Sequence, residues 1–187
     1  MTTPLPGDWY PGPAPLPRSE PVGAAPVSRS EASASAPVVR GGYPVLAFGD
    51  DALVAVAVPG AGARLSVRRD VAPLLVALAA AFHREVQPLD PLSCWGHCHA
   101  SATRGWNGHA AGIAVDLNAA AHPPGACGTF RPEQVPAVRG LITRWKYRGR
   151  PVLTWGGGDH HGGAAESHFE IAVPYPVALA VAAGLAT

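Results

Sequence analysis

The sequence of 187 residues lacks several features that would place it in other classes of protein. No apolar run reaches roughly 18 residues, so we expect no span across a membrane. No basic segment followed by an apolar run stands at the N-terminus, so we expect no secretory signal peptide. The net charge of +1 gives no indication of nucleic-acid binding. Three cysteines are an odd count that fits neither a disulfide framework nor a four-cysteine metal site.

The composition divides the chain into two parts. Residues 1–38 are rich in proline, alanine and serine and show neither helical nor strand periodicity. Such a segment buries too little apolar surface to offset the entropy lost on ordering, so we predict a disordered arm. Apolar residues make up 48% of the chain, which is enough for the core of one domain of ordinary size. We therefore predict a single folded domain at 39–187, and we expect it to be a monomer.

The segment 108–118, with the sequence GHAAGIAVDLN, combines an imidazole, a carboxylate and a short apolar run. In a strand over 113–117, the apolar odd-numbered residues face a core and Asp116 faces the opposite way. His109 stands seven positions earlier, so it must come from a turn, which the neighbouring glycines permit. An imidazole and a carboxylate that converge in this way suit zinc, which in catalytic sites takes a third protein ligand and leaves one position for water.

The candidate third ligand is in a second strand-like segment, 166–173, with the sequence ESHFEIAV. Strand alternation there turns Phe169 into the core and puts Glu166, His168 and Glu170 on the opposite face. A histidine flanked by two acids on one face of a buried strand is uncommon. The predicted zinc ligands are His109, Asp116 and His168. The alternative is that both histidines are ordinary hydrogen-bonded residues near a strand edge, in a soluble domain without a metal.

Four segments together resemble one family: GHAAGIAVDLNA, HPPGACGTF, TWGGGD and ESHFEI. They are similar to the zinc D-alanyl-D-alanine carboxypeptidases, and within that group to the L-alanyl-D-glutamate endopeptidases of phage lysins and actinobacterial cell-wall enzymes. The family pattern is a histidine, six residues, an aspartate, and a distal His-Phe-Glu that follows Trp-Gly-Gly-Asp. The resemblance runs from about residue 41 to 173. It implies zinc-dependent hydrolysis of a peptide bond in peptidoglycan stem peptides.

The sequence departs from this family at the position of the catalytic acid. The family carries the acid three residues before the last histidine, where this chain has Ala165. Glu166 follows, and two interpretations stay open. Either a shift of the backbone by one residue lets Glu166 act as general base, or the base is lost and the domain is a catalytically impaired, zinc-containing module that binds cell-wall peptide. Glu170 is better placed to orient His168.

The resemblance also implies residues that contact substrate. The family usually carries an arginine for a substrate carboxylate on the strand that here reads CWGHCH, at 94–99. His99 occupies that place, and Arg104 is the nearest cation that could substitute for it, with a solvated loop arginine as an equal alternative. Trp155 and Asp159 belong to the Trp-Gly-Gly-Asp motif beside the family's cleft. Asp159 could equally be a plain turn residue.

A second cluster of cysteine and histidine at 94–99 has poor spacing for zinc, since structural sites pair Cys-x2–4-Cys with a distant second pair. We predict buried free thiols, while a Cys94–Cys98 or Cys98–Cys127 bridge stays open. His122, in the HPPG segment, is predicted to be a loop residue and not a metal ligand.

The remaining patterns predict an α+β domain, in which a small antiparallel sheet carries the zinc site and two to three helices cover its other face. Further elements are predicted as helices at 71–86, 132–145 and 177–185 and strands at 53–58 and 151–155. Asp70 is the expected N-cap of the first helix. The missing signal peptide fits a phage endolysin released from the host cytoplasm, or a virion-borne enzyme, that acts on the cell wall. The sequence does not indicate which bond is cleaved, or whether the enzyme is an endo- or a carboxypeptidase.

Overall fold

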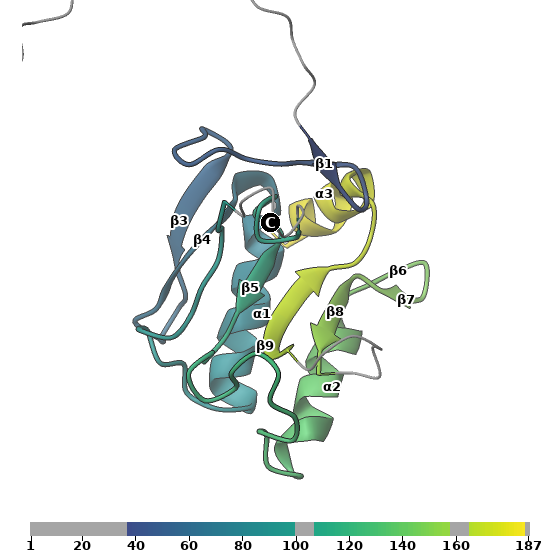
Figure 1. Cartoon of the computed structure of the whole chain (residues 1–187). Coiled ribbons are helices and arrows are strands. Elements are labelled where there is room, and N and C mark those ends of the chain that lie inside the picture. The colour runs from purple at the N-terminus through teal and green to yellow at the C-terminus, as the bar shows by residue number, and fades with distance from the viewer. Residues whose placement is uncertain (1–36, 100–106, 158–164, 186–187) are drawn as a thin grey trace, which may run out of the picture. The chain divides into compact units, whose positions relative to one another are not determined.

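The computed structural model describes residues 37–99, 107–157 and 165–185 (Figure 1). In chain order its elements are β1 Val38–Val39, β2 Tyr43–Pro44, β3 Leu53–Ala57, β4 Arg64–Arg68, a 3-10 turn Arg69–Val71, α1 Ala72–Glu85, β5 Ala114–Asp116, α2 Gln134–Arg144, β6 Lys146–Tyr147, β7 Arg150–Pro151, β8 Leu153–Gly156, β9 Ala165–Ile171 and α3 Tyr175–Ala183. The expected α+β class, with small antiparallel sheets and helices, is confirmed. Within these three ranges, no helix is long and apolar enough to cross a membrane.

The three-stranded sheet β5-β9-β8 contains both strands that were predicted to carry metal ligands. Its central strand, β9, is antiparallel to both neighbours and places His168 directly opposite Asp116 of β5. β3 and β4 form a separate hairpin. The chain near residue 96 joins the two sheets, because Trp95 forms an antiparallel bridge with Asp116 and the N–H of His97 donates to the carbonyl of Ser66 in β4.

Helix α1 lies behind this sheet in Figure 1. Phe169 of β9 meets Phe82 of α1 edge to face, with ring centroids 5.6 Å apart. The odd-numbered residues of the β5 region are fully buried, as strand alternation predicts: Ile113, Val115 and Leu117. One face of the sheet therefore packs against α1, and the other face can carry polar side chains.

All three helix starts differ from the sequence-based expectation, and α3 begins at Tyr175 and not at 177. Asp70 is not the N-cap of α1; Val71 is. The carboxylate of Asp70 instead accepts a hydrogen bond from the hydroxyl of Tyr175, and the 3-10 turn precedes the helix. Helix α2 begins at Gln134 and not at 132. Pro136 then lies in its first turn, where the missing N–H costs no hydrogen bond.

Candidate metal centre

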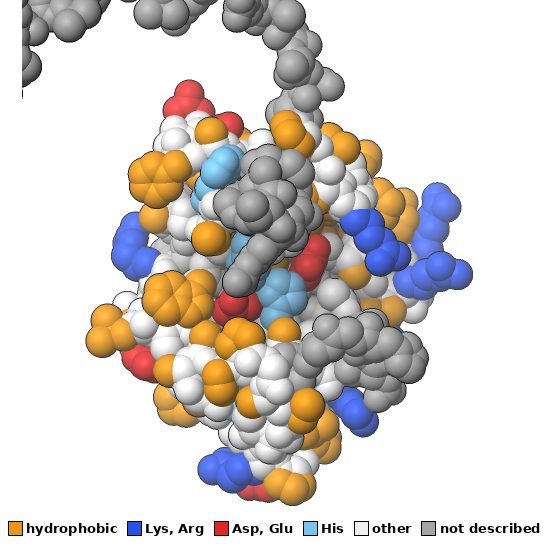
Figure 2. Space-filling model, in the orientation of Figure 1, with side chains coloured by type: hydrophobic (Ala, Val, Ile, Leu, Met, Phe, Trp, Pro, Cys, Tyr) orange, Lys and Arg blue, Asp and Glu red, His pale blue; other side chains and the backbone are white. Residues whose placement is uncertain are grey.

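Three side chains from a turn and two strands converge on one face of the β5-β9-β8 sheet. Nε2 of His109 lies 3.1 Å from Nδ1 of His168. Oδ1 of Asp116 lies 3.0 Å from Nδ1 of His168 and 3.4 Å from Nε2 of His109. His109 belongs to a turn at 108–112, as expected. Figure 2 shows acidic and histidine side chains meeting at the centre of this face. The three residues form a group that could bind a metal ion.

The outer nitrogens of both imidazoles are already engaged. Nδ1 of His109 donates to the carbonyl of Gly96 at 2.7 Å, and Nε2 of His168 donates to Oε2 of Glu170 at 3.1 Å. The other nitrogen of each neutral ring is then an acceptor, so two lone pairs face each other across 3.1 Å. Such an arrangement is repulsive unless a cation lies between the rings. That cation is either a metal ion or a proton.

The charges around the group favour a cation. Burial alone would raise the pKa of Asp116, but the adjacent imidazoles of His109 and His168 outweigh it and hold this pKa well below the usual range. Burial lowers the pKa of His168, yet hydrogen bonds to Asp116 and Glu170 reverse the effect and raise it to about 9. Without a metal ion, the site therefore holds a proton at neutral pH.

A buried arginine that the sequence analysis did not single out fixes the turn that carries His109. The Nε of Arg68 donates to the carbonyl of Ala111 at 3.0 Å, and its backbone N–H donates to the carbonyl of Gly112 at 2.8 Å. Gly112 has φ of +71°, and a Cβ there would lie 2.7 Å from the backbone nitrogen of Arg68. The turn thus needs glycine both for its conformation and for this close approach.

Glu170 lies where it can orient His168, as its position two residues along the strand predicts. Its carboxylate packs over Gly108, where a Cβ would lie 2.5 Å from Cδ and 2.6 Å from Oε1 of Glu170. The glycine before His109 therefore makes room for the acid that holds the other histidine. A carboxylate that accepts the outer N–H of a histidine fixes its tautomer and makes it a stronger ligand.

Glu166 does not share the face of His168 and Glu170. Its carboxylate accepts hydrogen bonds from the backbone N–H of Gly128 at 2.8 Å, the N–H of Thr129 at 2.7 Å, and the Thr129 hydroxyl. The cause is an irregularity in β9: Trp155 pairs with Phe169, but the next residue, Gly156, pairs with Ala165. Strand alternation is lost between these two pairs, and both Glu166 and Ser167 are buried.

A chain of partly buried hydrogen bonds continues from Glu166 through Thr129. Nε2 of Gln87 donates to Nε2 of His122 at 2.6 Å, and Nδ1 of His122 donates to the Thr129 hydroxyl at 2.7 Å. Burial lowers the pKa of His122, which fits the neutral tautomer that this chain requires. Burial raises the pKa of Glu166, but hydrogen bonds from Thr129 and Gly128 outweigh it, and the net shift is downward. An ionised Glu166 therefore ties the 128–129 loop to β9.

A cleft of about 750 Å³ lies beside the candidate ligands, and both His168 and Glu170 line it. Trp155 forms part of its wall and is otherwise buried, with its indole N–H donating to the carbonyl of Glu166 at 2.7 Å. Arg40 adds a basic side chain to the lining. The cleft is therefore the space next to the candidate metal centre that a substrate could fill.

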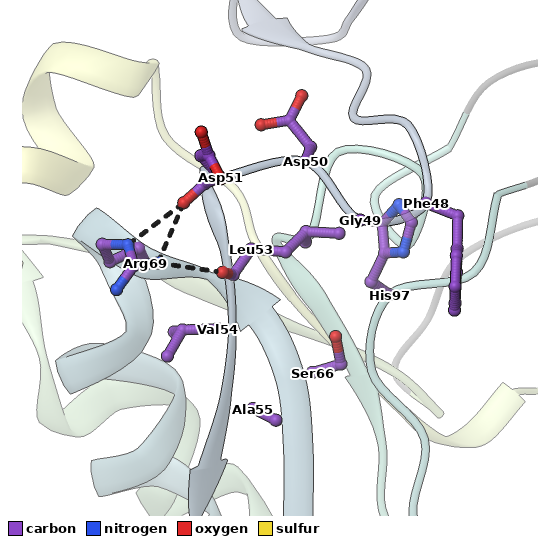
Figure 3. Close-up of a pocket in the computed structure, with 10 residues that line it drawn as sticks. All are labelled: Phe48, Gly49, Asp50, Asp51, Leu53, Val54, Ala55, Ser66, Arg69 and His97. Atoms are coloured by element: carbon purple, nitrogen blue, oxygen red, sulfur yellow. Dashed lines mark hydrogen bonds between the residues drawn. The ribbon is translucent and has the colours of Figure 1, made fainter.

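A second pocket, of about 440 Å³, lies along the β3–β4 hairpin (Figure 3). Arg69 stands on one side of it and His97 and Phe48 on the other. The guanidinium of Arg69 is bound to the carbonyls of Asp51 and Leu53, and Nε2 of His97 lies 3.0 Å from the carbonyl of Leu46. Since these polar groups hold neighbouring backbone in place, we do not assign the candidate site to this pocket.

The other residues with predicted roles lie as follows. His99 is exposed, and its Nδ1 lies 3.2 Å from the carbonyl of Leu46. Arg104 and Asp159 lie outside the described residues. The three cysteines are free thiols and form neither of the bridges left open by the sequence. Cys94 is buried as predicted, but Cys98 and Cys127 are exposed.

Three residues that shape the site were not predicted from the sequence: Arg68, Trp95 and Gly96. The backbone of Trp95 pairs with that of Asp116, and the carbonyl of Gly96 accepts a hydrogen bond from Nδ1 of His109. No spacing pattern marks these roles, because each depends on a backbone contact between segments far apart in the chain. For Arg68, the alternation of Leu65 and Val67 with polar neighbours was an available sign of a strand, but not of a buried guanidinium.

The comparisons with known proteins add no family assignment. No family model matches the sequence, and no curated protein or solved structure matches it. The family resemblance therefore stays a prediction carried by the sequence motifs.

Proposed function

We propose that this chain is a zinc-dependent peptidase that hydrolyses a peptide bond in peptidoglycan stem peptides. The observation that carries the proposal is the convergence of three ligand atoms, from His109, Asp116 and His168, beside a cleft of about 750 Å³. Ligands at the usual zinc distances in a tetrahedron are about 3.3 Å apart. The three separations of 3.0, 3.1 and 3.4 Å are close to that value.

The kind of donor favours zinc over the harder cations. Two imidazole nitrogens and one carboxylate oxygen suit zinc, whereas calcium and magnesium prefer oxygen ligands throughout. Three protein ligands also leave one tetrahedral position for water or substrate. When bound, zinc would polarise the scissile carbonyl and lower the pKa of a water molecule at that position.

The chain's own residues supply orientation and charge. Glu170 keeps the Nε2 proton of His168 on the outer side of the ring, and the carbonyl of Gly96 does the same for Nδ1 of His109. Each ring then presents its unprotonated nitrogen to the centre. Glu166 stays our prediction for the general base, and its role there requires its carboxylate to exchange the hydrogen bonds of the 128–129 loop for one to water.

The substrate class comes from the motif resemblance and not from the geometry. The segments around His109, Trp155 and His168 resemble those of peptidases that cut D-alanyl-D-alanine or L-alanyl-D-glutamate bonds, including phage endolysins and actinobacterial wall enzymes. A cleft with an arginine on its lining is compatible with an acidic peptide of this kind.

A second candidate function is a catalytically impaired, zinc-containing module that binds cell-wall peptide. Two observations favour it: Ala165 stands where the family has its acid, and the carboxylate of Glu166 is occupied by Gly128 and Thr129. Such a module would hold the metal and the peptide without cleaving it.

Mass analysis of a purified peptidoglycan digest separates the two. The peptidase is expected to release fragments that carry a new amino and a new carboxyl end at one type of bond, and the release should stop when zinc is chelated. A binding module would sediment with the peptidoglycan in a zinc-dependent way and release nothing. A protein that neither binds nor cleaves peptidoglycan contradicts both.

A further inference from the structure

An exposed tryptophan stands next to the candidate metal centre. Trp95 keeps 55% of its surface exposed. Its backbone N–H donates to the carbonyl of Asp116 at 2.8 Å, and the backbone N–H of Asp116 donates to the carbonyl of Trp95 at 2.9 Å. Residues directly opposite each other in an antiparallel pair project to the same face. The indole therefore rises from the face of the sheet that carries the Asp116 carboxylate.

The backbone beneath the indole is held on both sides. Gly96 accepts the hydrogen bond from Nδ1 of His109, and the next N–H, of His97, donates to Ser66 of β4. A Cβ on Gly96 would lie 2.1 Å from the carbonyl oxygen of Ser66, so only glycine fits where the chain passes β4. The backbone at Trp95 is thus held in place, and a ligand that binds the indole orders only the two torsions of its side chain.

Trp95, Asp116 and His168 form one row across three neighbouring segments, because Asp116 pairs with both of the others. The cleft lined by His168 lies farther along this row, over β9 and β8. Neighbouring strands are about 4.8 Å apart, and an extended peptide advances about 3.3 Å per residue. A peptide that fills the cleft and crosses the metal centre would reach the indole one to two residues from the scissile bond.

Among the residues that the structure describes, the indole of Trp95 has no polar or aromatic partner that explains its position. Within the described part of the chain, no hydrogen bond, ring contact or cation contact reaches its ring. In Figure 2, hydrophobic side chains cover the surface to one side of the central acidic and histidine group. A flat apolar surface beside a polar centre binds ligands that carry an aliphatic face next to polar groups.

We propose that Trp95 is a substrate-binding platform that takes an aliphatic face of the cell-wall substrate, one to two residues from the scissile bond. In peptidoglycan this chemistry is available from an alanine methyl group or from the C–H face of a sugar ring. This inference rests on the proposed function, since it takes the cell-wall peptide as the ligand of the cleft.

The test is the binding of zinc-loaded protein to two probes, measured by calorimetry: a free stem tetrapeptide, and the same peptide attached to its disaccharide. Trp95→Ala is expected to weaken binding about tenfold, the usual scale for a stacked aromatic contact, and Trp95→Phe to retain most of it. The matched control is Leu92→Ala, since Leu92 is an apolar side chain 87% exposed in the same segment; its binding should equal that of the wild type. Zinc content and the melting temperature should be unchanged in all three variants.

The two probes identify the group that is bound. A loss with both probes assigns the platform to the peptide, and a loss with the disaccharide probe alone assigns it to the sugar. Equal binding by wild type and Trp95→Ala, with both probes, would overturn the platform but leave the peptidase proposal intact. No binding of either probe by the zinc-loaded wild type would overturn both.

Discussion

Asp116 and His168 stand directly opposite each other in the β5–β9 ladder, with Oδ1 of Asp116 3.0 Å from Nδ1 of His168. The strand register thus sets the separation of two candidate ligands. His109 reaches the same point from a turn that Arg68 holds by hydrogen bonds to Ala111 and Gly112. Metal binding is therefore expected to depend on the packing of the sheet as well as on the ligands themselves.

The first prediction concerns the pH dependence of metal affinity. The pKa of His168 is raised to about 9, so a metal ion must displace a proton from it at neutral pH. We expect the apparent zinc affinity to rise about tenfold per unit between pH 7 and 8.5, with about one proton released per zinc. Calorimetry in buffers of different ionisation enthalpy measures both quantities. A constant affinity over this range, without proton release, would contradict the role of His168.

The raised pKa of His168 also predicts how the stability of the metal-free protein depends on pH. A histidine whose folded pKa exceeds its unfolded value of about 6.5 adds stability that is complete below pH 6.5 and is lost as pH rises through about 9. The melting temperature should therefore fall across this window in chelator. Zinc-loaded protein should not show this fall, because its His168 carries no proton to lose. If the melting temperature depends on pH in the same way with and without zinc, the raised pKa of His168 is contradicted.

The third prediction tests the contact between Gly108 and Glu170. Gly108→Ala would put a Cβ 2.5 Å from Cδ of Glu170 and displace the carboxylate that orients His168. We expect a loss of zinc affinity of about 10- to 100-fold, the usual effect of removing such a partner. Gly140→Ala in α2 is the control, because its Cβ would meet nothing within 4 Å. An unchanged zinc affinity in Gly108→Ala would contradict the role of Glu170 in orienting His168.

The fourth prediction addresses the catalytic base. Glu166→Gln can accept fewer of the three hydrogen bonds from Gly128 and Thr129, so we expect the free energy of unfolding to fall by about 1–3 kcal/mol. Zinc content should stay near the wild-type value. If Glu166 is the base, hydrolysis of a stem peptide should fall by roughly 10²–10⁴. If the folded variant still hydrolyses the peptide at the wild-type rate, Glu166 is not the base and serves only to hold the 128–129 loop.

Ala165→Asp completes that test by restoring the acid at the family's position. In an enzyme that already uses Glu166, the change should help little or should hurt, because two carboxylates near one water raise each other's pKa. In an impaired binding module, the same change is expected to create activity. Both variants are compared on one substrate, with zinc content measured in each.

The sequence predicted those parts of the fold that follow from local periodicity. The burial of Ile113, Val115 and Leu117 follows from strand alternation, and α1 follows from apolar residues at helical spacing. Asp70 was a reasonable N-cap by residue type, but Tyr175, 105 positions away, binds its carboxylate. Local rules cannot anticipate a partner at that distance in the chain.

The same limit explains what was missed at the site. Strand alternation in β9 predicted that Glu166 and Glu170 both lie on the face of His168. The prediction is confirmed for Glu170 and wrong for Glu166, because the register between β8 and β9 shifts in the part of β9 that contains Glu166. His122 was predicted as a loop residue, and it is one, but its burial in a hydrogen-bonded chain depends on Gln87 and Thr129. The proposed role of Trp95 depends on its isolated bridge to Asp116, and no local sequence pattern predicts that bridge.

The measurement that tests the central claim most directly is the zinc content of protein purified without chelator, by elemental analysis. We predict one zinc per chain in the wild type and the loss of most of it in His109→Ala, since a site with two protein ligands binds far more weakly. Replacing Cys94, Cys98 and Cys127 together with serine should leave the ratio unchanged, because none of them belongs to the ligand group. Wild-type protein that carries no zinc, even after zinc is added, would contradict the account.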